Sequence, residues 1–121
     1  MKKKENKIEL VSFKDFWMQE FKDIEYAREY LNEAIKNEDS DFFINSLRQV
    51  VEAQGGIKIL SEKTGLNKNT LYRTLSKNGN PELKTLVKIL DVYGIKLGFF
   101  SISDELKKEN NLIQKKELVH A

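Results

Sequence analysis

Residues 57–76 constrain the fold most strongly, because their two apolar-periodic stretches, 57–64 and 68–76, are too short to be stable as independent helices. Gly65 lies between them and predicts a tight turn, since glycine adopts positive φ readily. Two short helices that cross over such a turn need a small residue in the first helix and apolar residues that lock the pair together. The sequence supplies this pattern at Leu60, Ser61, Gly65, Leu66, Leu71 and Leu75. The segment therefore predicts a helix-turn-helix.

In a helix-turn-helix, the N-terminal residues of the second helix enter the major groove of DNA. Asn67 is placed to cap that helix. Lysine and arginine donate hydrogen bonds to guanine, and asparagine pairs bidentately with adenine. The residues expected to face bases are Lys68, Asn69, Tyr72 and Arg73, and those expected to lie near phosphates are Lys58, Lys63, Asn67, Thr70 and Lys77.

Charge is distributed unevenly along the chain. Residues 55–79 contain five basic side chains and one acidic side chain, whereas residues 1–54 contain nine basic and twelve acidic ones. A basic island is typical of a phosphate-facing surface, although a solvated helical face has the same composition. Tyr72 also has two interpretations, a contact in the groove or packing against the following helix. The partner predicted from this island is double-stranded DNA.

Apolar residues recur at three- and four-residue spacing before this segment, which predicts further helices. The first covers residues 12–21. The second is expected to begin after Asp23, and the third after Asp39 or Ser40, because these residue types favour the N-cap position. Glycines at positions 55 and 56 are expected to end the third helix.

A last helix and a strand are predicted after residue 79. Asn80 is expected to cap the helix, with Pro81 in its first position and Gly94 at its end. Beyond it, apolar residues alternate with Lys96 and Gly98, which is the two-residue period of a strand. A single strand has no stabilising neighbour, so pairing with the same strand of a second copy is expected. The dimerisation residues would be Ile95, Leu97 and Phe99.

Together these elements predict an all-α fold class. We expect a repressor-like helix-turn-helix domain of five to six helices over residues 12–102, with one short C-terminal strand used in dimerisation. Residues 1–11 are interpreted as a flexible basic N-terminus. Residues 103–121 are charged and weakly periodic, and are interpreted as a marginal helix or a mobile tail.

The first two predicted helices each carry a stripe with two interpretations. Large aromatic residues repeat along the first helix, either as core or as the surface that binds a partner. These candidates for binding a partner are Phe13, Phe16, Trp17 and Phe21. In the second helix, Glu25, Glu29 and Glu33 form an acidic stripe, which is either a surface for a basic partner or the solvated face of the helix.

Composition excludes several classes of protein. The chain has no cysteine and one histidine, so a thiolate zinc site and a cysteine nucleophile are excluded, and no metal site is expected. No nucleophile-and-base pair or phosphate-cradling glycine loop is present, which predicts a non-enzyme with no cofactor and no small-molecule substrate. No run approaches the roughly 20 apolar residues of a membrane helix. The expected compartment is the cytoplasm.

The motifs resemble those of the addiction-module antidote family over about residues 12–100. Two departures from general repressor practice are Ile57, where many repressors have a glutamine that contacts phosphate, and Ser61, where alanine is usual. The residues that carry the resemblance are Gly55-Gly56-Ile57, Leu60 to Asn67, Leu71-Tyr72-Arg73, Leu75-Ser76, Gly79-Asn80-Pro81, Gly94 to Leu97, and upstream Phe21-Lys22-Asp23 with Ala27, Tyr30-Leu31-Asn32 and Ala34.

The resemblance implies a function that periodicity alone does not. It implies a DNA-binding antitoxin of a type II toxin–antitoxin module, which neutralises a small RelE/ParE-like toxin by direct binding and represses its own operon as a homodimer. A stand-alone helix-turn-helix regulator without a toxin shares every DNA-facing residue and is the alternative. The toxin surface is left open between the aromatic first helix and the charged tail.

Overall fold

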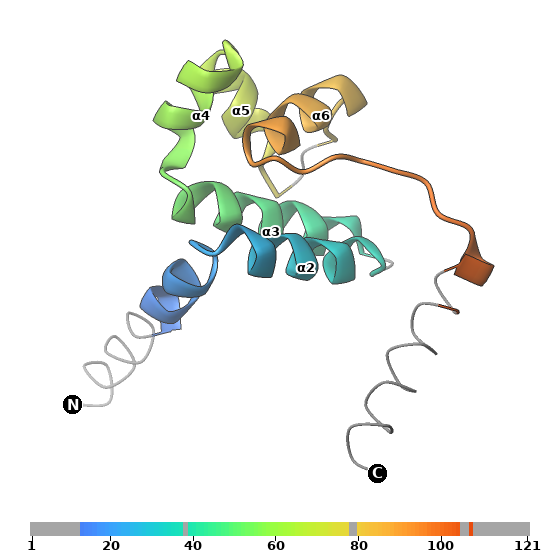
Figure 1. The fold of residues 1–121 in the computed structure, drawn as a ribbon. Coiled ribbons are helices and arrows are strands. Elements are labelled where there is room, and N and C mark those ends of the chain that lie inside the picture. The colour runs from blue at the N-terminus through green and yellow to red at the C-terminus, as the bar shows by residue number, and fades with distance from the viewer. Residues whose placement is uncertain (1–12, 38, 78–79, 105–106, 108–121) are drawn as a thin grey trace.

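The computed structural model describes residues 13–37, 39–77, 80–104 and 107, and this part of the chain is mostly helical, as the all-α prediction requires (Figure 1). Residues 13–20 form a first helix, which we call the leading helix. The further helices are α2 (Ile24–Ile35), α3 (Ser40–Ala53), α4 (Gly56–Thr64), α5 (Lys68–Thr74) and α6 (Leu83–Val92).

Two of the helices begin where their aspartates predict. The Asp23 side chain accepts a hydrogen bond from the Glu25 N–H at 3.0 Å, and the Asp39 side chain accepts one from the Asp41 N–H at 3.0 Å. Each bond satisfies a backbone donor that has no partner inside the helix. The predicted N-cap of α2 is confirmed, and Asp39 is the N-cap of α3.

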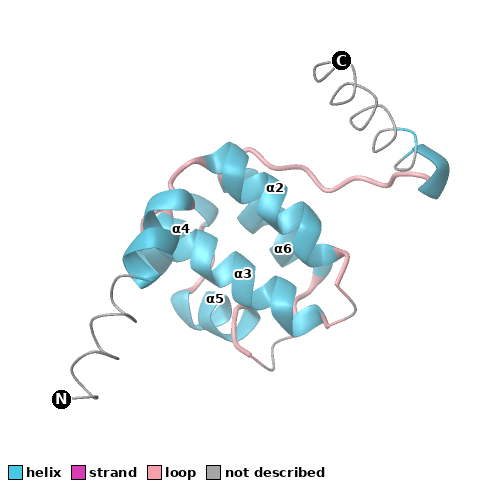
Figure 2. Ribbon diagram, turned by 90° about the horizontal axis from the view of Figure 1, so that it is seen from below, coloured by secondary structure: helices cyan, strands magenta, loops and turns pink. Residues whose placement is uncertain are grey.

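Helix α3 lies at the centre of the fold. It packs against α2 and α4, and α4 in turn contacts α5 and α6. Figure 1 shows the leading helix and α2 below α3 and the other three helices above it, and Figure 2 shows α2 and α3 side by side. The largest fully buried side chains come from α3, α4, α6 and the α5 region: Leu47, Leu60, Leu71, Leu75 and Ile89. One core therefore joins the helices on both sides of α3.

The predicted start of α6 is wrong by two residues. The helix begins at Leu83, and its N-cap is Glu82 rather than Asn80. Glu82 has ψ of 143°, so the chain is still extended there and Pro81 lies outside the helix. Proline disfavours the helical conformation of the residue before it, here Asn80, but does not oblige the helix to start at Pro81.

The predicted end of α6 is confirmed at Gly94. This glycine has φ of 74°, and its N–H donates to the Asp91 carbonyl at 3.0 Å. The next N–H, of Ile95, donates to the Leu90 carbonyl at 3.0 Å. This pair of bonds is a Schellman motif, which needs a residue that tolerates the left-handed conformation.

Residues 95–101 leave α6 along the path seen in Figure 1 and belong to no helix or strand. Ile95 packs against the core, whereas Leu97 is 42% exposed and Phe99 is fully exposed. A strand takes its hydrogen bonds from a neighbouring strand, and the described part of this single chain offers none. The predicted strand is thus not formed within one chain, and its pairing with a second copy stays a prediction.

The structure describes only part of the N-terminal and C-terminal segments of the chain. The predicted basic N-terminus, residues 1–11, lies outside the described residues, as does most of the predicted tail, 103–121. None of the helices that the structure describes has the length and apolar content to span a membrane.

Candidate nucleic-acid interface

The turn between α4 and α5 is built by Gly65 and two hydroxyl side chains. Gly65 is the C-cap of α4 at φ of 73°, as predicted, and its N–H donates to the Ser61 carbonyl at 2.9 Å. The Ser61 hydroxyl donates to the Leu66 carbonyl at 2.6 Å. Thr64 Oγ1 donates to the Leu60 carbonyl at 2.7 Å and accepts from the Leu66 N–H at 3.1 Å. The turn is therefore held by polar contacts as well as by buried leucines.

Ser61 has a larger part in this turn than its small size predicts. Alanine at this position would allow the same approach of the helices but would leave the Leu66 carbonyl without its side-chain donor. A hydroxyl four residues before the glycine that ends a helix is the sequence signal for this hydrogen bond. The prediction for Ser61 rested on its small size alone.

Replacing Gly65 by alanine is expected to lower the free energy of unfolding by about 1–2 kcal/mol, the usual cost of a Cβ in the left-handed region. Space is not the cause, because nothing lies within 4 Å of a Cβ built there. Urea unfolding measures the change. Gly98→Ala is the matched control, since Gly98 is not at positive φ and its Cβ would meet only the Phe100 ring at 3.5 Å. Equal stability of the two variants would contradict the argument.

Helix α5 exposes the side chains that were predicted to face bases. Its N-cap is Asn67, whose Oδ1 accepts from the Asn69 N–H at 2.7 Å, so the predicted cap is confirmed. Leu71 and Thr74 are buried on the other face of the helix. Tyr72 is 61% exposed, so most of its side chain is not packed against a neighbouring helix. The exposed side chains on α5 are Lys68, Asn69, Tyr72 and Arg73.

The residues predicted to lie near phosphates are distributed over α4, the start of α5 and the segment that follows α5. Lys58 and Lys63 lie on α4 and are exposed, and Lys77 is exposed just after α5. Asn67 is exposed although its side chain caps α5, and Thr70 is half-buried. The structure thus brings the basic island of the sequence onto two adjacent helices and the residues that follow them. Cationic and amide donors gathered in this way are suited to binding phosphate and base edges.

Arg48 helps to hold α5 against α3, a role that the sequence patterns did not predict. Its Nη1 donates to the Leu75 carbonyl at 2.9 Å, and its Nη2 donates to Asn45 Oδ1. Leu75 is the C-cap of α5, so Arg48 ties that end of α5 to α3. The two residues are far apart in sequence, and no local pattern predicts such a contact.

A pocket of about 200 Å³ is lined by residues of α2, α4 and α6 and of the ends of α3 and α6, and by none of α5. Its lining combines polar and apolar side chains and includes Leu60, Lys63 and Tyr93. Burial raises the pKa of Tyr93 to about 12, which keeps the phenol neutral. Among the described residues no group of histidine, cysteine, aspartate or glutamate is suited to hold a metal ion.

The aromatic candidates, three on the leading helix and Phe21 directly after it, differ in burial. Phe13 and Phe16 are 59% and 58% exposed, and Trp17 is half-buried. Phe21 is 2% exposed and belongs to the core. Phe21 therefore offers no surface to a partner, and its inclusion among the binding candidates is corrected.

The described structure is a mostly helical domain that presents a basic, exposed helix pair. The chain belongs to the family described as probable addiction module antidote protein, whose sequence profile matches residues 12–101. This confirms the resemblance, favours a non-enzymatic regulator and supports an antidote role, which implies a toxin partner in general terms. Neither the curated proteins nor the solved structures include a significant match.

Proposed function

We propose that this protein is the DNA-binding antitoxin of a type II toxin–antitoxin module, which represses its own operon and neutralises a small toxin by direct binding. The observation that supports DNA binding is the exposed basic face of α5, held on α4 by the Gly65 turn and on α3 by Arg48. Family membership supports the antidote role.

In this proposal the α4–α5 pair acts as a helix-turn-helix. Helix α5 enters the major groove, where its exposed lysine, asparagine, tyrosine and arginine face base edges. Lys58, Lys63 and Lys77 lie nearer the phosphates and supply affinity that does not depend on sequence. Such a regulator acts where the operon is, which places it in the cytoplasm.

A homodimer would place two α5 helices in successive major grooves, about 34 Å apart. The segment after Gly94 is suited to pair with its copy, because Leu97 and Phe99 are apolar, exposed and separated by the period of a strand. Ile95 already packs against the core, so residues on the same side of the strand would extend that core across a two-fold axis.

The toxin in this proposal is a small protein of the RelE/ParE-like type. Phe13 and Phe16 are the candidates of the leading helix that the structure leaves most exposed for it, with Trp17 beside them. Large exposed aromatic side chains are the residue type that most often dominates protein–protein affinity.

The antitoxin role is tested in a host that carries the neighbouring open reading frame and this chain under separate promoters. We expect the neighbouring protein alone to stop growth and the full chain to restore it. A neighbour without effect on growth would contradict the antitoxin role, and specific binding of the upstream DNA would then define a stand-alone regulator.

Arg73→Ala is expected to reduce discrimination between the operator and random DNA by about 1–3 kcal/mol, the usual value of a base-edge contact. Lys77→Ala is the matched control, because a lost phosphate contact weakens binding to every sequence alike. Fluorescence anisotropy with both DNAs at several salt concentrations measures the difference. An equal loss on both DNAs for Arg73→Ala would reassign Arg73 to phosphate contact.

A further inference from the structure

A series of aromatic ring contacts runs from the leading helix across α2 to the start of α3, in which Trp17 and Tyr30 are half-buried and the outer rings are exposed. Phe13 contacts Trp17 with ring centroids 5.3 Å apart, and Trp17 contacts Tyr30 at 6.2 Å. Tyr30 continues to Phe42 at 6.4 Å and stacks on Tyr26 at 6.5 Å. The aromatic ridge is defined as these contacting rings, Phe13, Trp17, Tyr26, Tyr30 and Phe42, together with the exposed Phe16 of the leading helix.

Contacts with α3 hold the leading helix, which carries part of the ridge, in a fixed position. Gln54 Nε2 donates to the Phe21 carbonyl at 2.8 Å and to the Lys22 carbonyl at 3.1 Å, which ties the end of the leading helix to the end of α3. An ion pair between Lys14 and Glu52 at 3.2 Å makes a second link between the two helices. With the helix held in this way, Phe13 and Phe16 still remain more than half exposed. A fixed group of exposed aromatic side chains is typical of a binding site.

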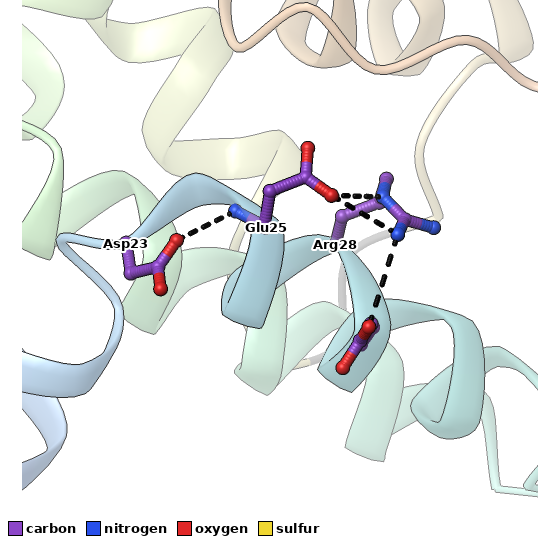
Figure 3. Close-up of polar contacts among 4 residues, drawn as sticks. Asp23, Glu25 and Arg28 are labelled. Atoms are coloured by element: carbon purple, nitrogen blue, oxygen red, sulfur yellow. Dashed lines mark hydrogen bonds and ion pairs between the residues drawn. The ribbon is translucent and has the colours of Figure 1, made fainter.

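The segments that carry the ridge are acidic. Residues 13–42 contain nine acidic and four basic side chains, a net charge of −5. One of those bases, Arg28, already faces Glu25 at 3.2 Å and Glu29 at 3.9 Å, and Figure 3 shows its guanidinium beside Glu25. Glu33 faces Lys36 at 3.4 Å, and its side chain is 77% exposed. The excess of negative charge repels nucleic acid and attracts a basic surface.

The leading helix and α2, which carry most of the ridge, lie on the opposite side of α3 from α4 and α5, which carry most of the DNA-binding candidates. In Figure 1 the leading helix and α2 are below α3, whereas α4 and α5 are above it. A protein seated on the ridge therefore leaves the exposed face of α5 open. The two surfaces differ in charge and in position, so each is suited to a different partner.

We propose that the aromatic ridge is the toxin-binding surface and that it selects a partner whose matching face is apolar at its centre and basic around it. This inference rests on the proposed antitoxin function. It extends the surface beyond the leading helix to Tyr26, Tyr30 and Phe42, and it assigns the acidic stripe of α2 a part in attracting the partner. Toxin and operator DNA bind the same antitoxin molecule together.

The probe for the test is the purified protein encoded beside the gene, titrated into the full chain. Phe13→Ser with Phe16→Ser is expected to weaken binding at least about tenfold, because a few central, often aromatic, residues supply most of the affinity of an interface. Leu83→Ser is the matched control, since Leu83 is an apolar residue of α6 that is 68% exposed. Circular dichroism establishes that each variant keeps its helical content and melting temperature.

The contribution of negative charge to binding is tested by comparing Glu29→Lys with Glu82→Lys. The second variant makes the same change of charge at an exposed residue outside the ridge. The Glu29 variant is expected to bind severalfold more weakly at low salt and to regain wild-type affinity in concentrated salt, because surface charge is screened. A gel shift with upstream DNA, antitoxin and probe is expected to show a slower band than the antitoxin–DNA complex.

The outcomes separate the two proposals. A probe that binds both ridge variants with wild-type affinity overturns the inference and leaves the antitoxin role standing. A probe that does not bind the wild-type chain, and has no effect on growth, overturns both. If Phe13→Ser with Phe16→Ser instead turns a dimer of the chain alone into a monomer, the ridge is a contact between copies and the inference is wrong.

Discussion

Leu71→Ala is expected to lower the free energy of unfolding by about 2–5 kcal/mol, the range seen when a buried leucine is truncated. Leu71 is 0% exposed and lies in the core that joins α5 to the central helices. Its removal leaves a cavity that the short α5 helix cannot close by itself, because neighbouring core residues come from other helices. Urea unfolding followed by circular dichroism measures the loss.

The adjacent substitution is the control. Tyr72→Ala removes a side chain that is 61% exposed, so the free energy of unfolding should change by no more than about 0.5 kcal/mol. The same substitution is expected to weaken operator binding severalfold, since Tyr72 faces outward from α5 beside Arg73. If Tyr72→Ala destabilised the fold as much as Leu71→Ala, the side chain would be packed against α6 and not available to DNA.

Sequence signals were sufficient where a structure depends on chemistry within a few residues. Asp23 and Asn67 were recognisable as caps because each side chain needs only an N–H two residues further on. Gly65 and Gly94 were recognisable because a helix end at positive φ favours glycine over every other residue. These local rules positioned α2 and α5 and the ends of α4 and α6.

Contacts between distant residues were not accessible in this way. Arg48 and Leu75 are brought together only when α3 and α5 are docked, and the same holds for Gln54 and the Phe21 carbonyl. The burial of Phe21 beside three exposed or half-buried aromatics depends on how the leading helix is tied to α3. Helical periodicity predicts an apolar stripe, but the docking angle decides which of its members reach the core.

Phe99→Asp is expected to reduce operator affinity by about 10²- to 10⁴-fold, because a monomer loses the gain from binding two linked half-sites at once. A charge placed in the pairing segment leaves an unpaired carboxylate in the proposed two-fold interface, which opposes association. Sedimentation is expected to show monomers. The melting temperature of the folded chain should change little, because Phe99 contributes nothing to the core of one chain.

Phe100→Asp is the discriminating control. Phe100 is 77% exposed and adjacent to Phe99, so the two variants have the same composition and nearly the same position in the chain. In a strand, successive side chains point to opposite faces, and Phe99 shares the face of Ile95, which already contacts the core. Phe100→Asp should therefore keep most of the dimer and most of the operator affinity. Equal losses for both variants would show that the segment associates through nonspecific apolar contact, and unchanged dimers in both would place the interface elsewhere on the domain.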